Sequence, residues 1–413
     1  MRSQKSSRIA VMAVFSAMLL VLNVVALAQT ETVIHTFSGT DGELPILGLT
    51  FDSAGNLYGV TAQGGSSNNG TVFQLVPNPW TLTTLLSFNG GAGGSTPSGA
   101  VIVESPGKIY GTTKLGGSNG AGVVFELSEA TSGKWTETVL HNFGSGKDGQ
   151  YPCGSVGFDS AGNIYGTTQA GGAYGNGTNT TGGTAYKLTP KSGGGWTETV
   201  IHSFGSGTDG ALPRANLVIN SVGNLYGTTY AGGQYGKGTV FELSPQSGGG
   251  WKEQVLHTFQ NNGVDGFEPI AGLIFDSNGN LYGTTVDGGS GYGGTVFELS
   301  PQSGGSWTET VLYNFYWLYP DELPYSGVVF DSAGNLYGAN LGRPNYSGEY
   351  GVVYKLTPQS GPSWLEKDLY TFDGPHGSEP AIGSLAIDSA GNIYGATQAG
   401  GSSKDGVIFK VTP

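Results

Sequence analysis

The sequence predicts an all-β protein, a seven-bladed β-propeller with four-stranded blades. The prediction depends on a repeated unit, on the strand-like pattern inside that unit, and on the match between the two chain ends. The tyrosine of a Leu/Ile-Tyr-Gly core marks each unit, at Tyr58, Tyr110, Tyr165, Tyr226, Tyr282, Tyr337 and Tyr394. By subtraction, the steps between these tyrosines are 52, 55, 61, 56, 55 and 57 residues, the near-constant period of a repeat architecture.

Four short strands are expected in each unit, as the fifth copy illustrates. The first is Gly272–Phe275, and Asp276–Asn280 follows as a tight turn that the aspartate caps and a glycine completes with positive φ. Leu281–Thr285, Thr295–Leu299 and Trp307–Phe315 are the other three, rich in β-branched and aromatic residues. No window has a helical apolar period, so we expect almost no helix.

The ends of the chain carry complementary strands. Thr30–Phe37 matches a fourth strand, whereas Val407–Val411 matches a third strand and lacks its partner. Pairing them would complete the last blade, close the ring and remove two exposed edges. An open solenoid is the alternative, but it leaves this match unexplained.

The N-terminal segment has the features of a secretory signal peptide. Basic residues precede an apolar run, Val11–Val25, and the small-x-small site Ala26-Leu27-Ala28 follows. We therefore expect residues 1–28 to be removed before Gln29 and residues 29–413 to form a single seven-repeat domain. The mature protein is expected to be secreted, without membrane insertion.

Composition excludes several classes of protein. The chain is glycine-rich (75 Gly), but 21 Tyr, 18 Phe and 7 Trp placed periodically argue against disorder. A net charge of −13 disfavours nucleic acid as a partner. Cys153 is the only cysteine, so packing rather than disulfides must hold the fold. We expect a monomer that needs no cofactor.

Most prominent side chains occupy repeat positions and are expected to pack rather than to bind a ligand. One such position, at the start of the fourth strand, holds Trp80, Trp135, Trp196, Trp251, Trp307 and Trp364. Another holds His35, His141, His202 and His257, and a catalytic base is not needed four times at equivalent sites.

The LYGTT core, the GG-x-x-x-x-GTVFEL run and the SP-x-SGG-W turn resemble the GloVer (Gloeo–Verruco) tandem repeat of secreted bacterial proteins. The resemblance covers residues 29–413, and the blade is also similar, more loosely, to NHL-type propeller repeats, which usually serve binding. It implies no established activity and no catalytic residues. Many members continue into a C-terminal anchoring segment, whereas this sequence ends at Pro413, so we expect release rather than anchoring.

An acidic position recurs in the connection between blades, within the pattern D-G-x-x-P. It is occupied by Asp41, Asp148, Asp209 and Asp265. A partial ring of carboxylates could hold a metal cation or a hydroxyl-rich ligand. The alternative is that each aspartate caps its own turn.

The sixth copy departs from the repeat in both loops of one face. Its inter-blade loop contains Tyr316, Trp317 and Tyr319, and its other loop contains Arg343 and Tyr346. Such side chains suit stacking on sugar rings, and they suit a protein partner equally. The alternative is loss of the repeat pattern, with the aromatic side chains folded inward.

These observations favour a secreted binding or scaffold module. We expect it to recognise polysaccharide or a cell-surface protein through the face that holds the inter-blade loops and the strand 2–3 loops. One alternative is a carbohydrate hydrolase or lyase, with Asp321 or Glu322 acting with Asp265 at the channel mouth. Another is a purely structural extracellular repeat protein.

Overall fold

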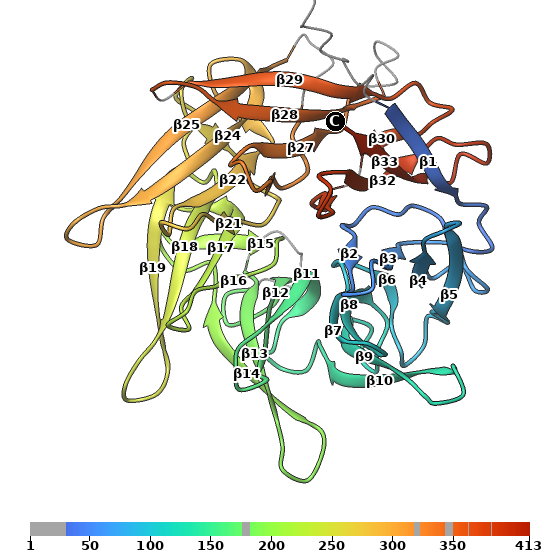
Figure 1. The fold of residues 1–413 in the computed structure, drawn as a ribbon. Coiled ribbons are helices and arrows are strands. Elements are labelled where there is room, and N and C mark those ends of the chain that lie inside the picture. Colours follow the sequence, from blue (N-terminus) through green and yellow to red (C-terminus); the bar gives the residue numbers. More distant parts are fainter. Residues whose placement is uncertain (1–29, 176–181, 318–322, 343–349, 362, 381) are drawn as a thin grey trace, which may run out of the picture.

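The computed structural model describes residues 30–413 except 176–181, 318–322, 343–349, 362 and 381. Seven antiparallel four-stranded sheets follow one another around a ring, in chain order (Figure 1). The described residues contain no helix. The prediction of a seven-bladed β-propeller is confirmed.

Each of the first six repeat copies supplies all the strands of its blade, whereas the seventh takes its outer strand from the N-terminal end of the described chain. Blade one consists of β2 (Thr50–Phe51), β3 (Leu57–Thr61), β4 (Thr71–Val76) and β5 (Thr81–Ser87), and blade two of β6 (Ser95–Pro97), β7 (Ile102–Ser105), β8 (Lys108–Leu115), β9 (Val123–Glu129) and β10 (Trp135–Asn142). Blade three consists of β11 (Gln150–Phe158), β12 (Ile164–Ala170), β13 (Thr184–Pro190) and β14 (Trp196–Ser203), and blade four of β15 (Gly210–Pro213), β16 (Val218–Ile219), β17 (Leu225–Gly232), β18 (Thr239–Pro245) and β19 (Trp251–Thr258).

The remaining blades repeat this arrangement. Blade five consists of β21 (Ile274–Phe275), β22 (Leu281–Thr285), β24 (Tyr292–Pro301) and β25 (Trp307–Tyr316), and β20 (Gly266–Phe267) pairs with β23 (Asp287–Gly288) as a separate two-stranded sheet. Blade six consists of β26 (Val329–Phe330), β27 (Leu336–Asn340), β28 (Val352–Pro358) and β29 (Trp364–Thr371). Blade seven consists of β30 (Ser378–Pro380), β31 (Ala386–Ile387), β32 (Ile393–Ala399), β33 (Val407–Thr412) and β1 (Thr30–Thr36).

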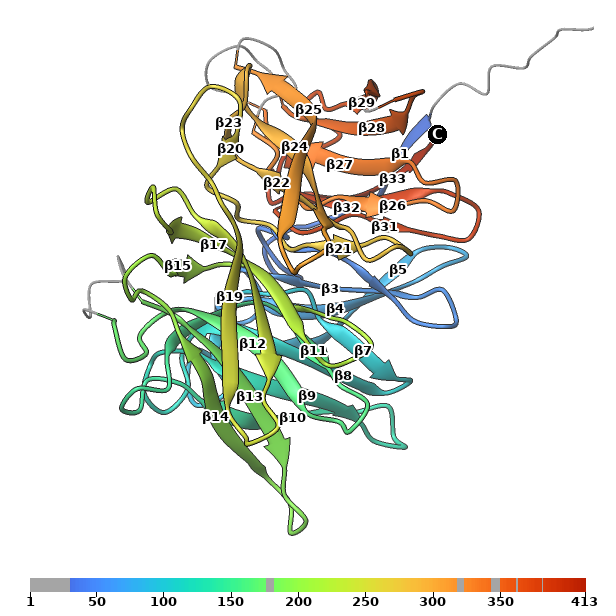
Figure 2. The same cartoon turned by 90° about the vertical axis from the view of Figure 1, so that its left-hand side faces the viewer.

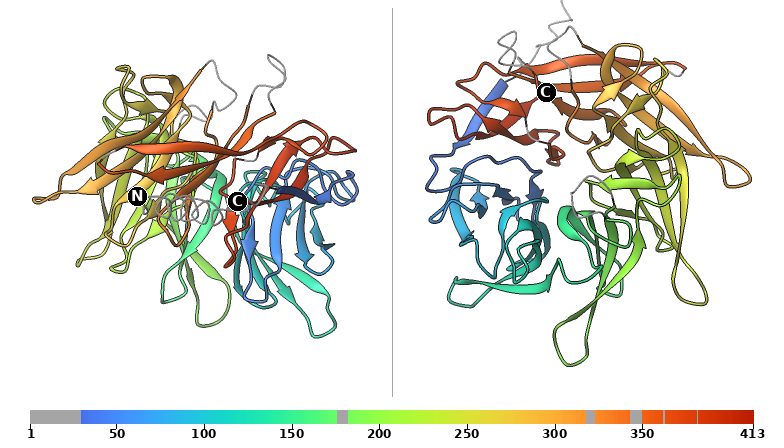
Figure 3. Two further views of the ribbon diagram at one scale, coloured as in Figure 1. Left: turned by 45° about the horizontal axis from the view of Figure 1, so that its top comes forward. Right: turned by 180° about the vertical axis from the view of Figure 1, so that it is seen from behind.

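The ring closes through the two ends of the described chain. β1 pairs antiparallel with β33, from Thr30 opposite Thr412 to Thr36 opposite Val407. The blue β1 lies beside the red strands of blade seven in views from the front and from behind (Figures 1 and 3). The predicted pairing of the two end strands, which completes the last blade, is therefore confirmed.

The aspartate turn between the first two strands is built by side-chain hydrogen bonds. Asp388 Oδ1 accepts the N–H groups of Ala390 and Asn392, both at 2.9 Å. Its Oδ2 accepts the Asn392 amide at 2.7 Å and the Tyr394 hydroxyl at 3.0 Å. The same network recurs at Asp52, Asp159, Asp276 and Asp331. The expected capping role of this aspartate is confirmed, and the repeated tyrosine has a partner within its own turn.

A second recurring feature joins neighbouring blades, and the sequence reading assigned its segment to a loop. The residue before the repeat proline has φ between 55° and 62° in every blade, at Leu44, Thr96, Tyr151, Leu212, Glu268, Leu323 and Glu379. Its N–H donates to a carbonyl of the preceding blade, as Leu212 does to Gly182 at 2.8 Å. In blades two, three, four, five and seven this segment also pairs as strand, within β6, β11, β15, β20 and β30.

The hydrophobic core consists of clusters between adjacent blades. Each repeat tryptophan is half-buried and packs against one of these clusters, as expected. Trp80, for example, meets the Tyr394 ring of the preceding blade edge-on at 5.9 Å between centroids. Cys153 is free and half-buried, with Sγ 3.1 Å from the Pro213 carbonyl. Packing between neighbours, rather than within one sheet, therefore holds the ring together.

Candidate functional site

The two faces of the propeller carry different connections. Viewed edge-on, β15, β20 and β23 lie toward one face, whereas β7, β21, β26 and β31 lie toward the other (Figure 2). The first face holds the inter-blade and strand 2–3 connections, and we call it the loop face. Long connections from several blades converge there, which makes it the place to look for a binding site.

A hollow of about 730 Å³ lies on the loop face at blade five. It is lined by Asn261, Phe267, Asp287, Gly288, Gly291, Tyr292, Tyr316 and Trp317. We call it the aromatic hollow. Its lining comes from the connection into blade five, the strand 2–3 connection of blade five, and the start of the connection into blade six.

The third and fourth strands of blade five build the aromatic hollow. β24 and β25 have 10 residues each, whereas β18 and β28, the third strands of the neighbouring blades, have 7. In the added length Tyr292 lies opposite Tyr316. The Trp317 N–H donates to the Gly291 carbonyl at 3.0 Å. The longer hairpin therefore brings three large aromatic side chains to one end of the blade.

These aromatic side chains face solvent to an unusual degree. The exposed fractions are 62% for Tyr292, 49% for Tyr316 and 46% for Trp317. Phe267 lies alongside, with the Lys237 ammonium 4.2 Å from its ring centroid. Because exposed aromatic residues gathered at one concave site are uncommon on soluble proteins, the group is a candidate contact surface.

The structure locates some of the ligand-binding residues predicted from the sequence. Tyr316 and Trp317 line the aromatic hollow together. Tyr319, Asp321, Glu322, Arg343 and Tyr346 lie outside the described residues. Sequence reasoning missed Tyr292, because its copy keeps the repeat pattern and only departures from that pattern were followed.

Each aspartate of the predicted acidic ring pairs with a histidine from the preceding outer strand. The distances from His Nε2 to the carboxylate are 2.9 Å for His35–Asp41, 3.2 Å for His141–Asp148, 3.0 Å for His202–Asp209 and 3.3 Å for His257–Asp265. Asp148 also caps its own connection by accepting the Gly144 N–H at 3.0 Å. The local contacts are thus those of the capping alternative.

A glutamate of the next blade approaches three of these pairs. Glu309 on β25 lies 4.0 Å from His257 Nε2, and Glu253 lines one cavity with His202 and Asp209. The equivalent residue at the third pair is Glu198, near Asp148. Burial raises the pKa of Glu198 and of Glu253 to about 7. Sequence reasoning missed these glutamates, although their alternation along the fourth strand places them on one face of the sheet.

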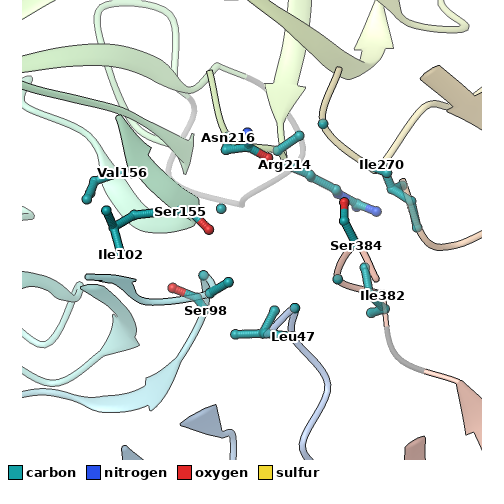
Figure 4. Close-up of a pocket in the computed structure, with 18 of the residues that line it drawn as sticks. Leu47, Ser98, Ile102, Ser155, Val156, Arg214, Asn216, Ile270, Ile382 and Ser384 are labelled. Carbon is teal, nitrogen blue, oxygen red and sulfur yellow. The ribbon is translucent and has the colours of Figure 1, made fainter. Parts of the chain in front are cut away.

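A second cavity, of about 390 Å³, lies at the centre of the ring (Figure 4). Small and apolar residues line it together with Ser98, Ser155, Asn216, Ser384 and one charged residue, Arg214. The Arg214 guanidinium stacks on Tyr230, 3.6 Å from the ring centroid. Sequence reasoning missed Arg214, the one charged residue among the seven that follow the repeat prolines.

The repeats decide the family. The family model of the Gloeobacter/Verrucomicrobia repeat matches residues 23–180 and 176–338. The chain belongs to this family. The resemblance inferred from the repeat motifs is thereby confirmed.

Solved structures with the same architecture share little sequence with this member of the Gloeobacter/Verrucomicrobia repeat family. A putative 6-phosphogluconolactonase from Bacteroides uniformis is 15% identical, with a TM-score of 0.51, covering 83% of this chain and 88% of that one. An ancestral GH74 enzyme is 12% identical, with a TM-score of 0.55, covering 90% of this chain. The match covers only 48% of that enzyme. At such identities the likeness shows the fold alone.

No curated protein matches the sequence. Across the described part of the repeat-family chain, no helix is long and apolar enough to cross a bilayer.

Proposed function

We propose that this repeat-family propeller is a secreted module that binds polysaccharide in the aromatic hollow of blade five. The observation that carries the proposal is the convergence of Tyr292, Tyr316 and Trp317 on one concave surface, all with about half or more of their area exposed. Exposed aromatic faces offer apolar area against the C–H face of a sugar ring at little cost in side-chain entropy.

Polar groups beside the aromatic rings suit hydroxyl-rich ligands. Asn261 and Asp287 line the same hollow. An amide offers both donors and acceptors, and a carboxylate accepts hydrogen bonds from hydroxyl groups. A mostly apolar hollow with a few polar groups is the usual make-up of a small-ligand site. This combination favours a sugar over a purely apolar partner.

The hydrolase or lyase alternative receives less support. Such chemistry needs two carboxyl groups roughly 5–10 Å apart. Among the described residues, no Asp or Glu lines the central cavity, and the Asp265 carboxylate pairs with His257 on the outer strand β19. Secretion remains the prediction drawn from the N-terminal segment.

The test measures binding of the protein comprising residues 29–413 to a panel of plant, fungal and bacterial polysaccharides. Binding is detected by affinity electrophoresis and by the change in tryptophan fluorescence. Trp317→Ala and Tyr292→Ala are each expected to weaken binding about tenfold, since each removes a stacking contact with the sugar of about 1.5 kcal/mol. Tyr235→Ala is the matched control, because Tyr235 is 50% exposed in the equivalent connection of blade four and lies outside the hollow.

Two results would overturn the proposal. One is the absence of saturable binding to every polysaccharide in the panel. The other is binding that Trp317→Ala and Tyr292→Ala leave unchanged while both variants keep the wild-type melting temperature. Binding to a protein of the cell surface, lost in the same variants, would reassign the hollow to a protein partner.

A further inference from the structure

A histidine and two carboxylates from two blades meet at the boundary of blades four and five. His257 lies on β19, Asp265 precedes β20, and Glu309 lies on β25 of the next blade. One ligand atom from each residue lies within 4.8 Å of the other two. We infer that His257, Asp265 and Glu309 form a binding site for a divalent transition-metal ion of the zinc type.

The spacing of the donor atoms fits a small tetrahedral ion. His257 Nε2 is 3.3 Å from Asp265 Oδ2 and 4.0 Å from Glu309 Oε2. Two ligand atoms that are each about 2.1 Å from a tetrahedral zinc ion lie about 3.4 Å apart. Small side-chain adjustments would therefore bring all three atoms within bonding distance of one ion.

Two buried oxygens at this point lack the hydrogen bonds that buried polar atoms normally make. Asp265 is 4% exposed, and its Oδ1 has no hydrogen-bond partner. Glu309 Oε1 is buried and has none either. The other oxygen of Asp265 is already used, because it accepts the Gln260 N–H at 3.0 Å. The corresponding glutamate oxygen is also unpaired at Glu137, which has no neighbouring aspartate, so the buried Asp265 Oδ1 is the oxygen that points to a missing ligand.

When both are ionised, the two carboxylates are acceptors only, so neither can donate to the other. A bound divalent ion would neutralise both groups.

The donor set selects the kind of metal. Calcium and magnesium take oxygen ligands almost exclusively, whereas an imidazole nitrogen with two carboxylates is a ligand set that zinc accepts. Three protein ligands leave a fourth position for water.

The chain contains its own comparison sites. The His35–Asp41 pair at the boundary of blades seven and one has Leu82 in the position of Glu309, since Leu82 pairs with Leu75 as Glu309 pairs with Leu299. Glu137 occupies that position in blade two, but there Gly93 stands in place of the aspartate. Neither of these boundaries has a complete donor set.

The experiment uses residues 29–413 without a histidine tag, stripped with a chelator and titrated with ZnCl₂ by calorimetry. Bound zinc is then counted by elemental analysis after gel filtration. Glu309→Leu, which copies the Leu82 boundary, is expected to bind one equivalent fewer than the wild type. Glu137→Leu removes an equivalent buried glutamate without a donor set, so it is expected to keep the wild-type stoichiometry. The result is the difference in bound zinc per chain between the wild type and each variant, so zinc bound at other blade boundaries does not affect it.

The milder variants Asp265→Asn and Glu309→Gln serve if Glu309→Leu fails to fold, as judged by circular dichroism. Each is expected to lose the same equivalent and the rise in melting temperature that zinc produces in the wild type. The inference is wrong if the wild type binds no zinc, or if the folded variants at 265 and 309 keep the full stoichiometry. Tighter binding of Ca²⁺ than of Zn²⁺ at this site would also overturn it.

Discussion

The ring of Pro45 packs directly against Gly406, and this contact joins the first blade to the last. A Cβ atom added to Gly406 would lie 2.6 Å from Pro45 Cδ. Beside it the Leu44 N–H donates to the Asp405 carbonyl at 3.2 Å. The same proline–glycine contact occurs at the six other boundaries, as Pro97–Gly70, Pro152–Gly122, Pro213–Gly183, Pro269–Gly238, Pro324–Gly294 and Pro380–Gly351. The closing boundary is therefore built like the rest.

Gly406→Ala is expected to destabilise the fold by about 2–4 kcal/mol, because it combines a left-handed backbone with overpacking. Gly406 has φ of 96°, and the added methyl group would collide with Pro45. Gly391→Ala is the control, since φ there is 83° and nothing lies within 4 Å of the added atom. Urea unfolding of both variants measures the difference, and equal losses would mean that the proline contact contributes nothing.

Asp388→Asn is expected to cost about 1–2 kcal/mol, because Oδ2 accepts hydrogen bonds from both Asn392 and Tyr394, and an amide nitrogen there would face the amide donor of Asn392. Ser389→Ala, at an exposed position of the same turn, is the control. Burial opposes ionisation of Asp388, but the hydrogen bonds lower its pKa below 3.8. The stabilisation should thus be complete above that pH and disappear as the pH falls below it. A variant penalty that persists at pH 2 would contradict this.

Glu137 should make the wild-type fold less stable as the pH rises. Burial raises its pKa from 4.5 to about 7. Between these values the unfolded chain releases a proton that the folded protein retains, so stability falls across that window and is level above it. Relative to wild type, Glu137→Gln should therefore gain stability from pH 4 to pH 8. Melting temperatures at both pH values test this, and a constant difference would refute it.

Cys153 should react slowly with thiol reagents in the folded protein. Burial raises the pKa of its thiol from 9.0 to about 11, and only the thiolate attacks. At pH 8 the thiolate population should be about 100-fold smaller than in the unfolded chain. Ellman's reagent with and without denaturant measures the ratio. Equal rates in the two states would show that the thiol is freely accessible.

Much of the fold was predictable because the forces that build one blade are local. The aspartate turn needs only Asp388, Asn392 and Tyr394, which lie within seven positions of one another. The pairing of Thr30–Thr36 with Val407–Thr412 was predictable for a different reason. One end of the chain carries a fourth strand without its repeat, and the other carries a repeat without its fourth strand.

The candidate site was predictable only in part. Trp317 was predictable because it breaks the repeat, and it lines the aromatic hollow. Tyr292 follows the repeat, so nothing in its own copy distinguishes it. Its importance depends on lying opposite Tyr316, 24 positions later, where the longer pairing of β24 with β25 carries both to the loop face.

The sequence alone determined the number of blades, their four strands, the turn chemistry and the closure of the ring, because periodic hydrogen bonding and burial repeat with the residues themselves. Only the tertiary structure decided which side chains of different blades meet. His257 and Glu309 are 52 positions apart, and Pro45 and Gly406 lie at opposite ends of the chain. Their contacts depend on how twisted sheets pack face to face around a closed ring, which no single repeat encodes.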